Sequence, residues 1–234
     1  MIDELKSTFE KHNYAVSEPI NNVLMVEDYL SKDELQWFLN LIKNTPENEW
    51  YVEYLSNLKP FCLEKFGRDD VDNLVAEGLF EITQGWEDKN LNFSNHEISK
   101  EITERLNKFI IKENVELNGF SSIQRMQFEV ELKSHVDQDT DPSIEYASII
   151  YLNDDYLNGE LFFENKNISL KPNPGTLLLF PGNKEFKHGV KHVGDGPTRY
   201  VIVGFIKNKK YYKHDRSGNK INEWQNMEYL NEFK

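Results

Sequence analysis

The hydrophobic residues in the first half of the chain recur at intervals of three and four, which is the spacing of one face of an α-helix. Two helices are expected, one after residue 31 and one after residue 94. Each follows a serine that precedes a glutamate by three residues, the capping-box pattern that satisfies free N–H groups at a helix start. The two pairs are Ser31 with Glu34 and Ser94 with Glu97. The apolar stripes are Leu35, Phe38, Leu39 and Ile42 in the first helix, and Ile98, Ile102, Leu106, Phe109 and Ile110 in the second.

The remaining segments of the first half have less regular patterns. Residues 22–29 predict a short strand, residues 69–78 a short helix and residues 84–93 a loop. These segments connect the two capped helices to the rest of the chain.

After Gly119 the pattern changes to short apolar segments separated by turn residues. Strands are expected at 122–132, 145–152, 160–164, 167–171, 176–181 and 199–206. The turn signals between them are Asp141-Pro142, Asn158-Gly159, Pro174-Gly175 and Gly194-Asp195-Gly196. Many short strands of this kind favour a sandwich or barrel, jelly rolls included.

A helix-rich front half and a strand-rich back half indicate an α+β fold in which helices pack on a β core. No linker separates the halves, so residues 1–234 are expected to form a single domain. It would comprise a helix-rich part at 1–116, a β core at 117–209 and a C-terminal tail at 210–234.

Composition narrows the class of protein. A net charge of −13 repels a phosphate backbone and argues against general nucleic-acid binding. Cys62 is the only cysteine, so no intrachain disulfide can form, which fits a reducing compartment. No signal peptide is visible at the N-terminus, and no apolar run approaches the roughly 18–20 residues that span a bilayer. A soluble, cytoplasmic protein without membrane contact is expected.

The candidate chemistry centres on His135 and Asp137, at the end of the segment predicted as a strand. Residues i and i+2 of a strand point to the same side, so both side chains can face one point. A second imidazole would complete the two-histidine, one-carboxylate set of non-haem Fe(II) oxygenases. His188 and His192 are both candidates for it, and spacing alone does not choose between them. Any single histidine is more commonly structural or solvated than a metal ligand.

Three later segments resemble the prolyl 4-hydroxylase-type 2-oxoglutarate/Fe(II) dioxygenases. They are 146–164 (YASIIYLNDDYLNGELFFE), 168–182 (ISLKPNPGTLLLFPG) and 188–206 (HGVKHVGDGPTRYVIVGFI). Their Tyr-Leu-Asn strand, Gly-Glu-Leu turn, Lys-Pro segment and His-x-Val-x-x-Val ending occur in the family's order. Segment 19–44 is similar to the family's N-terminal strand and helix. The resemblance implies a double-stranded β-helix core, of the jelly-roll or cupin type, flanked by N-terminal helices.

The resemblance also assigns roles to residues. It makes His188 the third iron ligand, because only His188 precedes x-Val-x-x-Val, and leaves His192 in a supporting or surface role. It places Arg199 against the distal carboxylate of 2-oxoglutarate, with Tyr151 beside it and Phe205 packed beneath the cosubstrate. The implied cofactor is Fe(II), with 2-oxoglutarate and O₂ as cosubstrates and ascorbate as reductant.

One family pattern is missing. Relatives carry Tyr-x-x-Gly-x-x-Tyr upstream of the His-x-Asp triplet, where this chain has Met126, Glu129 and Leu132. A rearranged cosubstrate pocket is therefore expected. The implied activity is hydroxylation of a C–H bond, of a prolyl residue in a protein or peptide first of all. Two alternatives stay open: the same chemistry on a free amino acid, another small molecule or a nucleobase, and a β-barrel binding protein without turnover.

Overall fold

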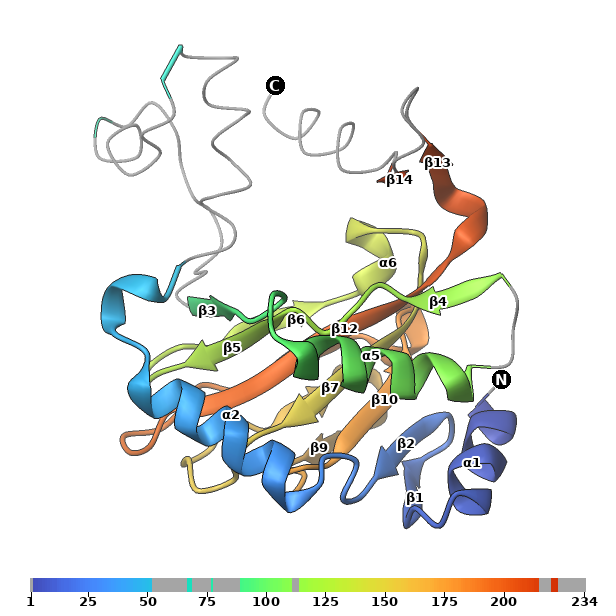
Figure 1. The fold of residues 1–234 in the computed structure, drawn as a ribbon, viewed down its shortest axis with the longest axis horizontal. Coiled ribbons are helices and arrows are strands. Elements are labelled where there is room, and N and C mark those ends of the chain that lie inside the picture. The colour runs from blue at the N-terminus through green and yellow to red at the C-terminus, as the bar shows by residue number, and fades with distance from the viewer. Residues whose placement is uncertain are drawn as a thin grey trace.

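The computed structural model describes residues 2–51, 67–68, 77, 89–110, 114–214 and 220–222. Within this set, two antiparallel β-sheets face each other and helices cover the outer side of the larger sheet (Figure 1). The helix predicted at 69–78 falls outside the described residues, except for residue 77.

The larger sheet, which we call the major sheet, has the strand order β1-β2-β10-β7-β12-β5-β3, and β4 also pairs with β12. Its strands are β1 (Val16–Ile20), β2 (Val23–Val26), β3 (Lys89–Asn92), β4 (Val115–Leu117), β5 (Ser122–Met126), β7 (Ile144–Tyr151), β10 (Leu177–Pro181) and β12 (Arg199–Asn208). The N-terminal part of the chain thus supplies strands to the core as well as helices. A loop was expected at 84–93, but residues 89–92 form β3, which pairs with β5 at the sheet edge.

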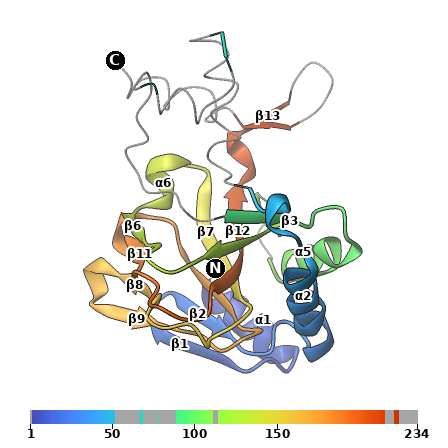
Figure 2. The ribbon, with the colours of Figure 1, turned by 90° about the vertical axis from the view of Figure 1, so that its left-hand side faces the viewer.

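The smaller sheet, which we call the minor sheet, has the order β6-β11-β8-β9. Its strands are β6 (Leu132–His135), β8 (Leu161–Phe163), β9 (Ile168–Leu170) and β11 (His188–Val190). The minor sheet lies on the opposite side of the major sheet from α2 and α5 (Figure 2). A separate short hairpin joins β13 (Tyr212–His214) to β14 (Lys220–Asn222).

The single strand predicted at 122–132 is in fact two strands in different sheets. β5 ends at Met126, and the N–H of Val130 donates to the carbonyl of Gln127 across a turn (3.1 Å). Glu129 within that turn has φ = 67°, which breaks the extended conformation. The chain therefore crosses from the major to the minor sheet before it reaches His135.

The helices are α1 (Ile2–Lys11), α2 (Lys32–Asn44), α5 (Glu97–Phe109) and the short α6 (Asp137–Thr140). The predicted capping box of α2 is confirmed, because Ser31 and Glu34 each bond to the other's backbone N–H. The one predicted for α5 is wrong. That helix begins after His96, which caps it without a side-chain hydrogen bond, and the N–H of Ser94 donates instead to Asn92 (2.8 Å).

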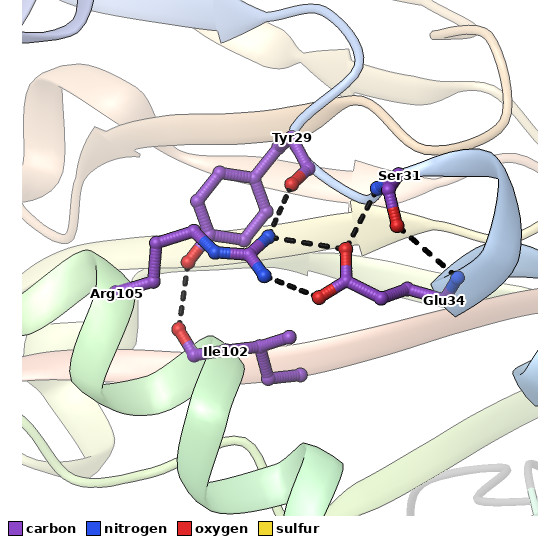
Figure 3. A network of polar contacts seen from close by, with 5 residues as sticks. All are labelled: Tyr29, Ser31, Glu34, Ile102 and Arg105. Atoms are coloured by element: carbon purple, nitrogen blue, oxygen red, sulfur yellow. Dashed lines mark hydrogen bonds and ion pairs between the residues drawn. The ribbon is translucent and has the colours of Figure 1, made fainter. Parts of the chain in front are cut away.

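A partly buried polar cluster joins α2 to α5 (Figure 3). Arg105 of α5 donates to both carboxylate oxygens of Glu34 and to the carbonyl of Tyr29 (2.6 Å). The hydroxyl of Tyr29 in turn donates to the carbonyl of Ile102 (2.7 Å). These bonds set the position of both helices on the sheet.

Alternation along the major-sheet strands divides the interior into two hydrophobic cores. One core packs the sheet against the helices, and the other lies between the two sheets. The helix-side core includes Phe38, Leu106, Ile150, Leu177, Leu179 and Ile202. The core between the sheets includes Ile149, Tyr151, Leu161, Phe163, Leu178, Phe180, Val190 and Val201. Side chains that face this second core are the ones that can reach a site enclosed by both sheets.

Among the described residues, none of the helices combines the length and the apolar character that a membrane span requires.

Candidate metal centre

Three potential metal ligands meet at one end of the minor sheet. His135 is the last residue of β6, Asp137 begins α6, and His188 is the first residue of β11. His135 and His188 are direct cross-strand partners, and their ring centroids lie 4.5 Å apart. One donor atom from each of the three residues lies within 4.8 Å of the other two. Such a group of two imidazoles and one carboxylate can bind one face of a divalent metal ion.

Backbone contacts orient both imidazoles toward the shared point. The Nδ1 of His135 lies 2.9 Å from the carbonyl oxygen of Lys133, and the Nδ1 of His188 lies 3.0 Å from that of Phe186. A carbonyl can only accept, so each Nδ1 carries the hydrogen and each Nε2 is left with a lone pair. The Nε2 atoms lie 3.5 Å and 3.9 Å from Oδ1 of Asp137.

The aspartate has an unmet interaction of its own. Asp137 is 6% exposed, and its Oδ2 is buried without a hydrogen-bond partner. A buried carboxylate oxygen without a partner carries a substantial desolvation cost. A cation between the three side chains would remove that cost, so this donor set fits a metal ion.

The histidines differ in protonation. Burial is the largest influence on His188 and lowers its pKa, which keeps its ring neutral and able to bind a metal. Burial also lowers the pKa of His135, but the hydrogen bonds to Asp137 and to the Lys133 carbonyl outweigh it, and the net pKa is raised. Protonation therefore competes with metal binding more strongly at His135 than at His188.

Asp137 reaches the site although it does not lie in a strand. Val136 is extended (φ = −122°, ψ = 123°), so the expected same-side relation of His135 and Asp137 holds up to the start of α6. The turn that follows is anchored by an ion pair between Lys207 and Asp141 (2.9 Å). Gly182 packs closely against the start of this turn, since a Cβ at position 182 would lie 3.3 Å from Cβ of Asp137.

His192 is not part of this cluster. It is exposed, lies outside the strands, and its ring contacts Phe128 at a centroid distance of 6.1 Å. Of the two candidates for the third ligand, the structure brings His188 to His135 and Asp137.

Arg199 lies at the start of β12, on the sheet face that looks into the core between the sheets. It is 1% exposed, and no carboxylate of the described residues lies within ion-pair distance of it. Its Nη1 contacts the sulfur of Met126 at 3.4 Å, and its Nε has no partner. A buried guanidinium in this state is a receptor for an anion, because its charge is otherwise uncompensated.

Two buried phenols lie next to that guanidinium. The Cζ of Arg199 is 5.4 Å from the ring centroid of Tyr151 and 6.0 Å from that of Tyr156. Neither phenolic oxygen has a hydrogen-bond partner. Sequence reasoning proposed Tyr151 but missed Tyr156, which lies in an irregular segment between β7 and β8 where no periodic pattern marks it. Phe205 is half-buried and packs at the edge of the same core.

The segment that contains these residues is similar to known proteins. Residues 121–207 match the model of the 2OG-Fe(II) oxygenase superfamily. This segment of the β core is similar to that superfamily, and all three candidate metal ligands, Arg199 and both phenols lie inside it.

Two solved structures and one curated protein are examples of the proteins similar to this chain. A prolyl hydroxylase from Trichoplax adhaerens, in complex with a hypoxia inducible factor peptide fragment, aligns with TM-score 0.56 and 16% identity over 89% of this chain and 92% of that one. A viral collagen prolyl hydroxylase from Paramecium Bursaria Chlorella virus-1, in its 2OG complex, aligns with TM-score 0.55 and 15% identity over 80% and 97% of the two chains. Human prolyl 3-hydroxylase 2 is 31% identical over 77 residues, which are 31% of this chain and 11% of that protein.

The structural similarities establish the fold, and the curated relative is matched over only about a tenth of its length. The predicted family resemblance is confirmed, as is the double-stranded β-helix core with flanking helices. The roles of Arg199, Tyr151, His135, Asp137 and His188 stay predictions, which the geometry above supports.

Proposed function

We propose that this protein is a 2-oxoglutarate- and O₂-dependent Fe(II) dioxygenase that hydroxylates a C–H bond of a prolyl residue in a protein or peptide. One observation carries the proposal: the cluster of His135, Asp137 and His188 occurs in the same interior as Arg199, which is buried and has no counterion among the described residues. The first feature fits Fe(II), and the second fits the distal carboxylate of a 2-oxo diacid.

When bound, Fe(II) and 2-oxoglutarate supply the oxidation: O₂ and 2-oxoglutarate give succinate and CO₂, and one oxygen atom enters the substrate C–H bond. The protein's own residues do the positioning. The two imidazoles and Asp137 would hold the metal ion. Arg199 would donate two hydrogen bonds to the distal carboxylate, a bidentate contact that a planar guanidinium suits. Because Asp137, His188 and Arg199 are buried, charge contacts made by these side chains are stronger than they would be in water.

Substrate choice would come from the parts around the site, since the fold and metal ligands are shared by enzymes of different specificity. The segment 138–145 follows Asp137 directly, and 183–187 precedes His188. The prolyl hydroxylases among the similar structures support a protein or peptide substrate. Hydroxylation of a free amino acid or another small molecule is the second candidate. A nucleic-acid substrate is disfavoured by the net charge of −13.

Two accessory features belong to the same proposal. Ascorbate serves as the reductant that keeps the iron in its Fe(II) state. A reducing, cytoplasmic setting fits a chain whose single cysteine, Cys62, excludes an intrachain disulfide.

The experiment is succinate release by purified protein with Fe(II), ascorbate, 2-oxoglutarate and O₂. Wild-type protein should release succinate, His135→Ala should not, and His192→Ala is the matched control that should retain activity. Proline-containing peptides should then gain 16 Da in a mass spectrum. Absence of both succinate and bound metal in the wild type would refute the dioxygenase proposal and favour a non-catalytic binding protein.

A further inference from the structure

Tyr156 is a buried tyrosine whose hydroxyl has no hydrogen-bond partner. Its side chain is completely buried, and it belongs to the segment that connects β7 to β8. Buried phenols normally find a partner, so an orphaned hydroxyl in the interior needs an explanation. Arg199 lies near this ring, with its Cζ 6.0 Å from the Tyr156 ring centroid.

The ring of Tyr156 is held in place from the outer side. The Nζ of Lys171 donates to the carbonyl oxygen of Tyr156 at 2.5 Å and lies 4.4 Å from the ring centroid. Gly159 approaches the other edge, since a Cβ there would lie 3.1 Å from Cδ2 of the ring. Gly159 also has φ = 67°, a conformation that favours glycine. The ring is thus positioned before any ligand arrives.

The side chain opposite Arg199 in the sheet supplies no hydrogen-bond donor that would replace this phenol. Met126 is the cross-strand partner of Arg199, and its thioether can accept a weak hydrogen bond but can donate none. The guanidinium and the nearby phenols of Tyr151 and Tyr156 are hydrogen-bond donors that an anion at Arg199 could use. A carboxylate has about four lone-pair sites, more than a bidentate guanidinium can fill.

We propose that Tyr156 donates its hydroxyl hydrogen to the distal carboxylate of 2-oxoglutarate, as a positioning residue beside Arg199 and Tyr151. This inference rests on the proposed function. It identifies a residue that contributes to binding from the β7–β8 connection rather than from β5, where Met126 offers no donor. Burial raises the pKa of Tyr156 to about 12, which keeps the phenol protonated and able to donate at neutral pH.

The test compares two 2-oxo acids by calorimetry, with Mn(II) in place of Fe(II) so that no turnover occurs. 2-Oxoglutarate has the distal carboxylate, whereas 2-oxobutyrate has the same chelating end without it. Tyr156→Phe should raise the Kd for 2-oxoglutarate about 10- to 100-fold, the loss of one charge-assisted hydrogen bond. It should leave the Kd for 2-oxobutyrate unchanged. Tyr146→Phe, which removes a half-buried phenol on the helix side of β7, is the matched control and should change neither.

A second readout is kinetic: Tyr156→Phe should raise the KM for 2-oxoglutarate and leave kcat within about twofold of the wild type. An unchanged Kd for 2-oxoglutarate would overturn the inference and leave the proposed function standing. Equal weakening of both acids would also overturn it, since the phenol would then act through the general shape of the pocket. Failure of the wild type to bind either acid would refute the proposed function itself. The variant removes a hydroxyl without a partner, so its thermal unfolding midpoint should match the wild type.

Discussion

Replacing Arg199 with methionine should separate the stability of the fold from cosubstrate binding. Arg199 is 1% exposed, its Nε lacks a partner, and its hydrogen-bond contact within the described residues is the sulfur of Met126. Replacement of a poorly compensated buried charge by an apolar side chain of similar length is commonly neutral or stabilising, by about 1–4 kcal/mol. The metal-free variant is therefore expected to be as stable as the wild type or more stable.

Arg199→Met should weaken 2-oxoglutarate binding, and this loss of binding free energy should be larger than the change in the unfolding free energy. A bidentate contact to the 2-oxoglutarate carboxylate provides two charge-assisted hydrogen bonds, each contributing roughly 1.5–3 kcal/mol. Loss of about 3–6 kcal/mol corresponds to a Kd that is about 10²- to 10⁴-fold weaker. Arg199→Met should thus gain or keep stability while it loses the cosubstrate.

Urea unfolding of the metal-free protein and calorimetric titration with Mn(II) and 2-oxoglutarate measure the two effects. Arg125→Met is the matched control, because Arg125 is also buried but pairs with Glu47 (2.5 Å) and stacks on Trp50 (4.5 Å). It should lose stability and retain cosubstrate binding. A loss of more than about 2 kcal/mol in Arg199→Met would show that the fold itself compensates this charge. Unchanged 2-oxoglutarate affinity would place the cosubstrate elsewhere.

Three further predictions concern the helix cluster, the ligands and their strand. Arg105→Met should lower the unfolding free energy by about 1–3 kcal/mol in urea at pH 7. Arg105 holds the pKa of Glu34 below its ordinary value, so the difference between variant and wild type should persist above the ordinary glutamate pKa and shrink as the pH falls through the lowered one. A difference that does not depend on pH would contradict this reasoning. In NMR titrations of metal-free protein, His135 should titrate above, and His188 below, the ordinary histidine pKa, and the reverse order would refute the assigned contacts. Gly189→Ala would place a Cβ 2.5 Å from a carbonyl oxygen of β6, so it should separate β6 from β11. Metal binding should then weaken at least tenfold in a Mn(II) titration. Unchanged affinity would show that the strand pairing tolerates the methyl group.

The fold could be predicted from the sequence where periodic patterns are long. The α2 stripe and its capping box, and the strands at β7, β10 and β12, lie close to their expected bounds. Short elements were harder. β11 has three residues and no alternation of buried and exposed positions. Within the segment 122–132 the chain crosses between the two sheets, at a turn in which Glu129 has a positive φ.

In the candidate site, too, some features could be predicted from the sequence and others could not. The relation of His135 to Asp137 follows from local geometry, so the sequence could suggest it. The choice of His188 over His192 depends on which strand pairs with β6, and a cross-strand register is not encoded in the spacing of histidines. Tyr156 had no signal in the sequence, because its role depends on a connecting segment that folds over Arg199.

The most direct test of the account is anaerobic calorimetry of metal-free protein with Fe(II). The account predicts one Fe(II) per chain and at least a hundredfold loss of affinity in Asp137→Ala, because that variant removes the only carboxylate of the cluster found among the described residues. It also predicts wild-type affinity in His192→Ala. Binding that survives in Asp137→Ala, or no binding in the wild type, would contradict the assignment of His135, Asp137 and His188 as a metal centre.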